Sequence, residues 1–338
     1  MDLYKDARIA QLKQYLEHQF GDQSIALSVV SGDASFRRYF RFFHQGQSYI
    51  AVDAPPDKED SRPFVEISKA YAEQGLNVPQ VVHYDLALGF MCLTDLGDAL
   101  LLPALTAENV DGYYQKSLAL LDEIGKAVQT DSGDLPLFDE ARLREEMQLF
   151  TDWLLPYHLE VKLSEHEQQV VEQVFTRLVE NALVQPQVGV HRDFHSRNLM
   201  IQPDDSIAVI DYQDAVIGPV TYDAVSLLRD CYIVWPDDVV YRHLSAFKSV
   251  MAQSIDSLHS VSDETFIRWF DWMGLQRHIK VCGIFARLYY RDGKAGYLDD
   301  IPRVMQYIID VGSKYPQFAE FVVLVQQKLQ PLLLSKVG

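Results

Sequence analysis

The chain has 338 residues, of which 48% are hydrophobic and 23% are charged, an ordinary composition for a globular protein long enough to bury a substantial core. Its formal net charge of −18 argues against a nucleic-acid partner and against a polybasic membrane anchor, because both rely on clustered Lys and Arg. The three cysteines are far apart in apolar surroundings, which predicts buried free thiols in a reducing compartment.

The N-terminal twenty residues form the pattern of an amphipathic charged helix and do not resemble a secretory signal. No apolar run reaches the ~18 residues that a membrane-spanning helix needs. We therefore expect a cytoplasmic protein that does not enter a membrane, and nothing in the pattern implies an obligate protein partner.

Residues 25–96 are dominated by predicted strands. Apolar or alternating runs are bounded by turn residues such as Gln45-Gly46 and by the strand-breaking pair Pro55-Pro56. One helix, ending near Gly75, interrupts the strands after the third. The predicted strands cover 25–30, 36–43, 48–52, 81–84 and 90–94, and the helix covers 62–74.

After residue 96 the pattern becomes helical, with one short β segment at 188–211. The sequence thus predicts an α+β, bilobal fold: a β-rich N-lobe over 1–96 with a five-stranded sheet, and a mainly helical C-lobe over 97–338. A short connection near Asp95 suggests a hinge over a ligand-binding cleft. The predicted helices cover 107–130, 139–154, 164–183, 221–231, 238–257, 263–290 and 314–335.

The β segment at 188–211 carries polar residues whose types and spacing indicate a chemical function. A strand, a polar loop, a second strand, a turn and a third strand bring Asp193, Asn198 and Asp211 to one end of an apolar hairpin. Phosphoryl transfer needs such a set, because Mg²⁺ takes carboxylate and amide oxygens and neutralises the charge that spreads over the moving phosphoryl group. Asn198 and Asp211 are the predicted metal ligands. Asp193 is the predicted catalytic residue that orients the acceptor hydroxyl and accepts its proton.

The stretch His191-Arg-Asp-Phe-His-Ser-Arg-Asn198 resembles the HRDxxxxN catalytic loop of protein kinases and the HxDxxxxN loop of aminoglycoside phosphotransferases. The resemblance implies a protein-kinase-like fold that uses ATP and Mg²⁺. It gives His191 a scaffolding role. It also implies that Asp223, in Gly218-Pro-Val-Thr-Tyr-Asp223, braces the backbone of the catalytic loop.

A narrower resemblance covers roughly residues 25–300 in spaced blocks. The blocks SGDASFRRYFR, AVDAPPDKEDSRPFVEI, LTDLGD, HRDFHSRNLM and FARLYYRDGK resemble the bacterial anomeric N-acetylmuramate/N-acetylglucosamine kinases of cell-wall recycling. This implies a small-molecule amino-sugar acceptor that is phosphorylated on its C1 hydroxyl. Two alternatives are an aminoglycoside-, choline- or homoserine-type kinase and a nucleotide-binding pseudokinase.

Two parts of the kinase pattern are altered, which motivates the pseudokinase alternative. The glycine-rich loop is reduced to Ser31-Gly32-Asp-Ala-Ser35, whose backbone N–H groups and hydroxyls are the predicted phosphate contacts. Asp53 stands where kinases carry the strand lysine. A cation must then compensate, and Arg38, followed by Arg37, is nominated because arginine binds phosphate bidentately. The alternative is that these arginines are solvated edge residues.

The remaining candidates concern the adenine and the acceptor. By resemblance to the kinase hinge, Leu93 and Asp95 supply backbone hydrogen bonds to adenine. Aromatic and charged side chains suit a sugar, which offers C–H faces and hydroxyls. In this sequence the predicted acceptor contacts are Glu146, Trp153, His195, Arg287 and Arg291, the two arginines facing the lactyl carboxylate of N-acetylmuramate. Core packing and helix-dipole pairing are the alternatives for these positions.

Overall fold

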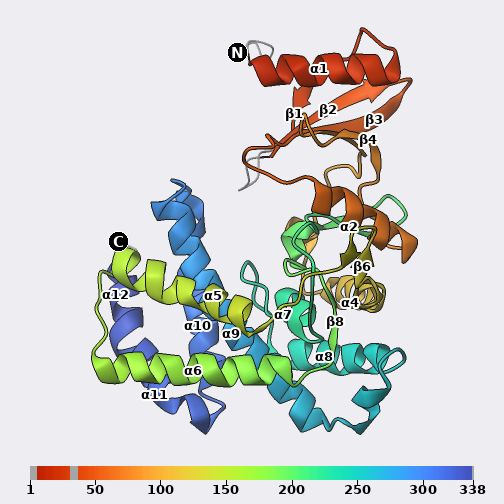
Figure 1. Cartoon of the computed structure of the whole chain (residues 1–338). Helices are drawn as coiled ribbons and strands as arrows, with labels where there is room; N and C mark the ends of the chain where they lie inside the picture. Colours follow the sequence, from red (N-terminus) through yellow and green to blue (C-terminus); the bar gives the residue numbers. More distant parts are fainter. Residues whose placement is uncertain (1–5, 31–36, 337–338) are drawn as a thin grey trace. The chain divides into compact units, whose positions relative to one another are not determined.

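A computed structural model describes residues 6–30 and 37–336 of the chain, and their contacts divide it into two compact units (Figure 1). Unit 1 comprises Met1–Leu101, Gln129–Asp134 and Asn198–Asp214, and unit 2 comprises Leu102–Val128, Leu135–Arg197 and Ala215–Gly338. The lobe boundary expected at residue 96 stays a prediction.

Unit 1 is built on a five-stranded antiparallel sheet with the order β1-β2-β3-β5-β4. Gln45 and Gly46 both have positive φ, of 49° and 79°, and form the two-residue turn that sets the register of His44 opposite Gln47. The strands are β1 (Ser28–Val29), β2 (Arg38–His44), β3 (Gln47–Asp53), β4 (Val81–Asp85) and β5 (Phe90–Thr94).

Helix α1 (Ala7–Phe20) covers one face of this sheet (Figure 1). The carboxylate of Asp6 caps its first turn by accepting from the backbone N–H groups of Arg8 and Ile9. The apolar positions repeat at helical spacing, so one stripe of the helix enters the core. That core contains Ile9, Leu12, Leu16, Phe40, Phe42, Ala51, Phe90 and Cys92.

Helix α2 (Arg62–Glu73) follows β3, and its aromatic residues reach the segment after β10 (Ile207–Val209). The rings of Phe64 and Tyr71 lie 4.9 and 5.6 Å from the ring of Tyr212. Residues distant in sequence are thereby joined in one unit, which explains why 198–214 belongs to unit 1. The remaining strands of unit 1 are β6 (Gln129–Thr130), β7 (Gly133–Asp134) and β9 (Leu199–Ile201).

Unit 2 is organised around the 28-residue helix α9 (Asp263–Tyr290), which most other helices of the unit contact. At Gly283 the neighbouring backbone comes so near that a Cβ atom would lie 2.2 Å from the carbonyl carbon of Leu149. The other α-helices of unit 2 are α4 (Val110–Lys126), α5 (Glu140–Leu149), α6 (Glu165–Leu183), α7 (Tyr222–Leu228), α8 (Asp237–Met251), α10 (Ile301–Gly312), α11 (Ala319–Leu324) and α12 (Gln330–Leu334). Unit 2 also contains the π-helices η2 (Phe150–His158) and η7 (Val325–Leu329) and the strands β8 (Gln187–Val190) and β11 (Val216–Pro219). The boundary between the two units falls within the short helix α3 (Leu101–Ala104).

Several element boundaries differ from the sequence-based expectation. The first strand shrinks to Ser28–Val29, and the helix expected over 139–154 continues to His158 as a π-helix that contains Pro156. Helix α10 was missed, although its buried residues recur at helical spacing. The helix expected at 314–335 is confirmed over 316–334, where a 3-10 turn, α11, the π-helical stretch Val325–Leu329 and α12 follow one another without a gap.

Cys92, Cys231 and Cys282 are buried free thiols, as predicted. Among the described residues, no helix combines the length and the apolar character that crossing a membrane requires.

Candidate active site

The loop that carries Asp193 follows β8, which pairs with β11 in unit 2. Arg192 has a φ of +75°, a conformation that residues other than glycine rarely adopt and that needs tertiary support. The carboxylate of Asp223, in the first turn of α7, gives that support. It accepts from the backbone N–H of His191 at 2.6 Å and from that of Arg192 at 3.0 Å.

A second carboxylate, which sequence reasoning missed, holds the far end of the same loop. Asp230, just beyond α7, accepts from the backbone N–H of Ser196 at 2.9 Å and from its hydroxyl at 2.5 Å. Asp230 is fully buried. The seven-residue spacing from Asp223 was the available signal, because the helix predicted over 221–231 would place residues seven apart on the same face.

Asp193 is surrounded by cations of unit 2. Burial alone would raise the pKa of its carboxyl, but the charges of Lys280, Arg192 and Arg277 contribute to lowering that pKa to about 2. Asp193 is therefore ionised at neutral pH. A carboxylate of such low basicity serves chiefly to accept a hydrogen bond from a hydroxyl and to orient it.

Glu146, predicted as an acceptor contact, lies in a buried ionic cluster. Its Oε1 accepts from Nη2 of Arg192 at 2.5 Å and from Nζ of Lys280 at 2.8 Å. Lys280 also donates to the hydroxyl of Tyr222 at 2.9 Å. Burial opposes the ionisation of Glu146, but the two cations hold its pKa below the ordinary value. Arg192 and Lys280 were not predicted, since sequence spacing does not reveal that α5, α9 and the loop meet.

His195 lies within the same loop, with its backbone N–H donating to the Asp193 carbonyl at 2.9 Å. Its ring meets the ring of Tyr232 edge-on at 5.3 Å, and the guanidinium of Arg197 lies 3.6 Å from the centre of that Tyr232 ring. Burial lowers the pKa of His195, so the imidazole is neutral at pH 7.

The predicted metal ligands lie in unit 1, at one end of the β9–β10 hairpin. Leu199 pairs with Val209 in the antiparallel register, so Asn198 and the segment ending in Asp211 leave the hairpin together. The amide nitrogen of Asn198 lies 3.3 Å from a carboxylate oxygen of Asp211. Asp211 has a φ of +66° and also accepts from the amide of Gln213 at 2.9 Å.

The chemistry of this pair fits Mg²⁺. The ion takes hard oxygen ligands and usually binds through one or two protein groups, with phosphate and water completing its shell. Among the described residues, no group of three or more His, Cys, Asp or Glu side chains is arranged to hold a metal. The ligand preference of Mg²⁺ makes Asn198 and Asp211 candidate ligands for an ion that is shared with a nucleotide.

Asp53, which replaces the strand lysine, is neutralised by two arginines of unit 1. Its Oδ1 accepts from Nε and Nη2 of Arg8 at 2.8 and 2.5 Å, and its Oδ2 accepts from Nε of Arg38 at 2.9 Å. Arg38 also pairs with Asp6 at 2.5 Å. Sequence reasoning expected a compensating cation and nominated Arg38. It missed Arg8, which α1 brings across the sheet.

The other predicted phosphate contacts divide into two groups. Ser31, Gly32 and Ser35 lie outside the described residues. Arg37 is buried and pairs with Glu59 at 3.3 Å. Glu66 on α2 accepts hydrogen bonds from the hydroxyls of Thr130 and Ser132.

The two hinge candidates lie at the end of β5. Leu93 is buried and pairs in register with Ile50 and Val81 on its two sides. The carboxylate of Asp95 accepts from Nε of Arg41 at 2.6 Å and from the hydroxyl of Ser48. Burial opposes the ionisation of Asp95, yet these donors hold its pKa below the ordinary value. Because the Asp95 side chain is occupied, an adenine contact here would come from the backbone.

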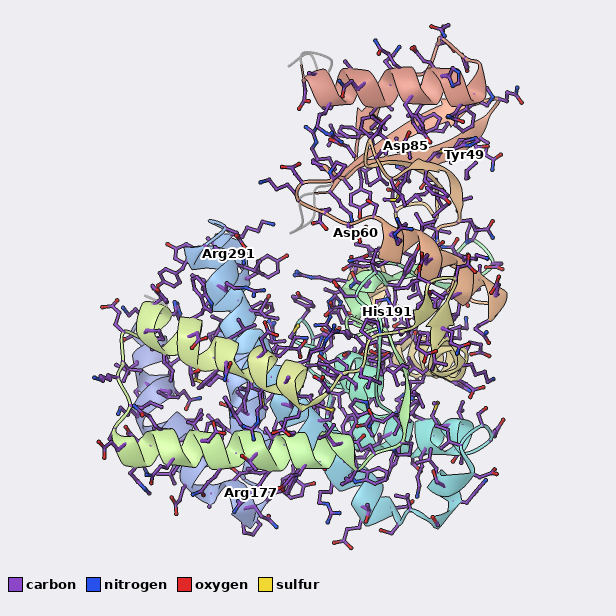
Figure 2. The ribbon with its side chains drawn as sticks, in the orientation of Figure 1. Tyr49, Asp60, Asp85, Arg177, His191 and Arg291 are labelled. Atoms are coloured by element: carbon purple, nitrogen blue, oxygen red, sulfur yellow. The ribbon has the colours of Figure 1, made fainter. Side chains whose placement is uncertain are left out.

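The aromatic candidate Trp153 belongs to a row of rings in unit 2. It stacks on Tyr157 with ring centres 5.1 Å apart, and Tyr157 lies 6.0 Å from Tyr290 at the end of α9. Arg291 is exposed and forms a two-bond pair with Asp292, and Figure 2 shows it well separated from His191. Arg287 is half-buried, and its Nε has no hydrogen-bond partner in the part of the chain that is described.

Residues 26–254 match the phosphotransferase enzyme family. The chain is 40% identical over 326 residues to the N-acetylmuramate/N-acetylglucosamine kinase of Pseudomonas aeruginosa, covering 93% of this chain and 95% of the relative. It is 39% identical over 323 residues to the kinase of the same name from Neisseria meningitidis, covering 94% and 95%. The chain therefore belongs to the phosphotransferase enzyme family, and the predicted small-molecule kinase is confirmed at that level.

Solved structures with a similar fold are also kinases of small molecules. The ethanolamine kinase of Plasmodium vivax aligns with a TM-score of 0.65 and 11% identity, covering 94% of this chain and 90% of that one. The choline kinase of Streptococcus pneumoniae aligns with a TM-score of 0.60 and 13% identity, covering 90% and 100%. At such identities the likeness concerns the fold, and the predicted protein-kinase-like α+β fold is confirmed.

Proposed function

We propose that the protein transfers the γ-phosphoryl group of ATP to the anomeric hydroxyl of N-acetylmuramate or N-acetylglucosamine. The observation that carries the proposal is Asp193, a carboxylate kept ionised by surrounding cations in a loop whose backbone is fixed by Asp223. The identity to amino-sugar kinases over more than nine tenths of the chain supports this acceptor class. The three buried thiols support a reducing, cytoplasmic location.

In the proposed mechanism Asp193 accepts a hydrogen bond from the acceptor hydroxyl and aims its oxygen at the phosphorus. Because the transition state of phosphoryl transfer is loose, the hydroxyl keeps its proton until late, and a weakly basic carboxylate can receive it then. Asn198 and Asp211 would hold Mg²⁺, which supplies charge neutralisation for the phosphate oxygens when bound. Asp223 and Asp230 keep the loop from moving away from the acceptor.

Of the two arginines considered for the lactyl carboxylate, Arg287 is the better supported. The charge of Lys280 acts on Asp193. Counted along the axis of α9 from Lys280, Arg287 lies about 10 Å further on and Arg291 about 16 Å further on. Long helical side chains lean back toward the helix N-terminus, so the Arg287 guanidinium can shorten its distance while Arg291 stays beyond a monosaccharide. Within residues 6–30 and 37–336, the buried Nε of Arg287 also has no hydrogen-bond partner, whereas Arg291 is paired with Asp292.

The test is an ATP-consumption assay with Mg²⁺ and each of four acceptors: N-acetylmuramate, N-acetylglucosamine, choline and kanamycin. We expect turnover with the two sugars and none with the two cationic acceptors. Turnover with choline or kanamycin alone would replace the proposal by the cationic-acceptor alternative. Nucleotide binding without any turnover would favour the pseudokinase.

A variant distinguishes the two sugars. Arg287→Gln should raise KM for N-acetylmuramate about tenfold, because a charge-assisted hydrogen bond is lost. KM for N-acetylglucosamine, which lacks the carboxylate, should stay unchanged. The matched control is Arg291→Gln, which should leave both values unchanged. Equal effects of both variants on both sugars would remove the carboxylate contact.

A further inference from the structure

We propose that Glu146 is a positioning residue, and that its ion pairs with Arg192 and Lys280 hold the loop bearing Asp193 in the conformation used for phosphoryl transfer. The inference rests on the proposed kinase function. It assigns Glu146 a role different from the acceptor contact expected from sequence.

The contacts of Glu146 leave little room for a substrate. Its Oε1 accepts from Arg192 at 2.5 Å and from Lys280 at 2.8 Å, and its Oε2 accepts from the amide of Gln276 at 3.4 Å. Counted over the whole residue, Glu146 is 8% exposed to solvent and Lys280 is 6% exposed. A sugar hydroxyl at this carboxylate would have to displace a charged, buried donor, which costs more than an exposed hydrogen bond returns.

Arg192, in the catalytic loop, is held both at its backbone and at the end of its side chain. Arg192 directly precedes Asp193 and has the rarely occupied φ of +75°. Asp223 fixes the backbone N–H groups of His191 and Arg192, and Glu146 fixes the opposite end of the Arg192 side chain. With both ends held, the backbone at Arg192 cannot relax toward negative φ without breaking an ionic contact, and the Asp193 carboxylate keeps its direction.

The second cation, Lys280, offsets the cost of burying the Glu146 carboxylate. A single Glu–Arg pair taken out of water gains little, because desolvation offsets the attraction. Lys280 adds a second cation to Glu146 and satisfies the Tyr222 hydroxyl at 2.9 Å. The cluster thereby links α5, α9, α7 and the catalytic loop of unit 2 through one carboxylate, which suits an anchor rather than a ligand-binding group.

The first experiment compares Glu146→Gln with Glu145→Gln, its exposed neighbour on α5. We expect Glu146→Gln to lower kcat by about 10- to 100-fold, since small misplacement of a reacting group has effects of that size. KM for ATP and for the sugar should stay within about twofold, because neither substrate touches Glu146. Glu145→Gln should behave as the parent protein does. A raised sugar KM with normal kcat would overturn the proposal and make Glu146 an acceptor contact.

The second experiment asks whether Glu146 acts through Arg192. Arg192→Gln should lower kcat by a similar factor, and the double variant should lose no more than either single variant, because both changes release the same anchor. Multiplied losses in the double variant would overturn the proposed link. If Glu146→Gln fails to fold, Glu146→Asp keeps the charge beside Lys280 but shortens the side chain that reaches Arg192, and it should still lower kcat; a normal kcat in that variant would overturn the proposal.

The third measurement separates this inference from the acceptor assignment. Hydrogen–deuterium exchange of the peptide covering 191–197 should be faster in Glu146→Gln than in the parent protein or in Glu145→Gln. This readout needs no substrate. If the parent protein turns over no sugar, the proposed function fails while exchange still decides the role of Glu146. Unchanged exchange in Glu146→Gln would overturn the inference whatever the acceptor is.

Discussion

Each unit contains a carboxylate held by two cations from different elements, and the two clusters differ in exposure. In unit 1 Asp53 is fully buried, but the side chains of Arg8 and Arg38 are 32% and 37% exposed. In unit 2 the two cations that pair with Glu146 are less exposed: the side chain of Lys280 is 7% exposed and that of Arg192 is 23% exposed. The same charge arrangement thus faces solvent in one unit and the protein interior in the other.

This difference indicates what each cluster can do. A cation that is one-third exposed can keep one hydrogen bond to Asp53 and still offer N–H groups to a phosphate. Lys280, whose side chain is only 7% exposed, is enclosed with its carboxylate and lacks this freedom. The unit 1 cluster is therefore a candidate ligand site, and the unit 2 cluster is a support for Asp193.

The largest effect is expected where the unit 2 cluster acts, at Asp193. Asp193→Asn keeps the shape and removes the carboxylate, so kcat should fall by about 10³-fold. Nucleotide affinity, measured by equilibrium binding, should be nearly unchanged. The control is Asp238→Asn in the exposed first turn of α8, which should have full activity. A large loss of nucleotide binding would mean that Asp193 has a different role.

The enclosure of the unit 2 cluster depends on close packing of α9 against the junction of α5 and η2. Gly283→Ala would place a Cβ atom 2.2 Å from the Leu149 carbonyl carbon, so we expect a loss of about 3 kcal/mol in the free energy of unfolding. Gly274→Ala in the same helix meets only Val225 at 3.8 Å. It should be neutral or stabilising by up to about 1 kcal/mol through helix propensity. Urea unfolding measures both, and equal values would contradict the packing described for α9.

The exposure of the unit 1 cluster is tested by its two arginines. Arg8→Ala and Arg38→Ala each remove one partner of the buried Asp53, so both should destabilise the protein by about 1–3 kcal/mol. Only Arg38→Ala should also raise KM for ATP, by about tenfold, if Arg38 binds the phosphates. Arg8→Ala is the matched control for the lost ion pair. An equal KM in both variants would leave Arg38 with a structural role alone.

The smallest effect concerns the outermost residue of the unit 1 cluster. The hydrogen bond from Arg38 lowers the pKa of Asp6 to about 2, whereas an unfolded chain titrates Asp near 4. The folded pKa is the lower one, so the stabilisation is present above about pH 4 and disappears as pH falls toward 2. Because Asp6 is well exposed, the difference between the parent protein and Asp6→Asn should stay below about 1 kcal/mol. Urea unfolding at several pH values measures it, and a difference that grows on acidification would contradict the sign.

The sequence predicted the parts of the site that lie close together along the chain. Asp193 and Asn198 share one loop, and the register of the β9–β10 hairpin follows from two apolar strands and a polar turn, which also brings Asp211 to Asn198. The sequence did not reveal Arg8, Lys280 or Asp230 as partners. Their contacts join elements separated by tens to more than a hundred residues, and no local pattern specifies such a pairing.

The sequence by itself determined the family and the five-stranded sheet with its inserted helix, and it singled out Asp193, Asn198 and Asp211 as the candidates for phosphoryl transfer, because motif, period and turn chemistry are local properties. Only the tertiary structure decided which charges meet. It gave Asp53 two arginines, enclosed Glu146 between Arg192 and Lys280, and surrounded Asp193 with cations. The physical reason is that the energy of a charge depends on its distance to other charges and to water, and folding alone sets those distances.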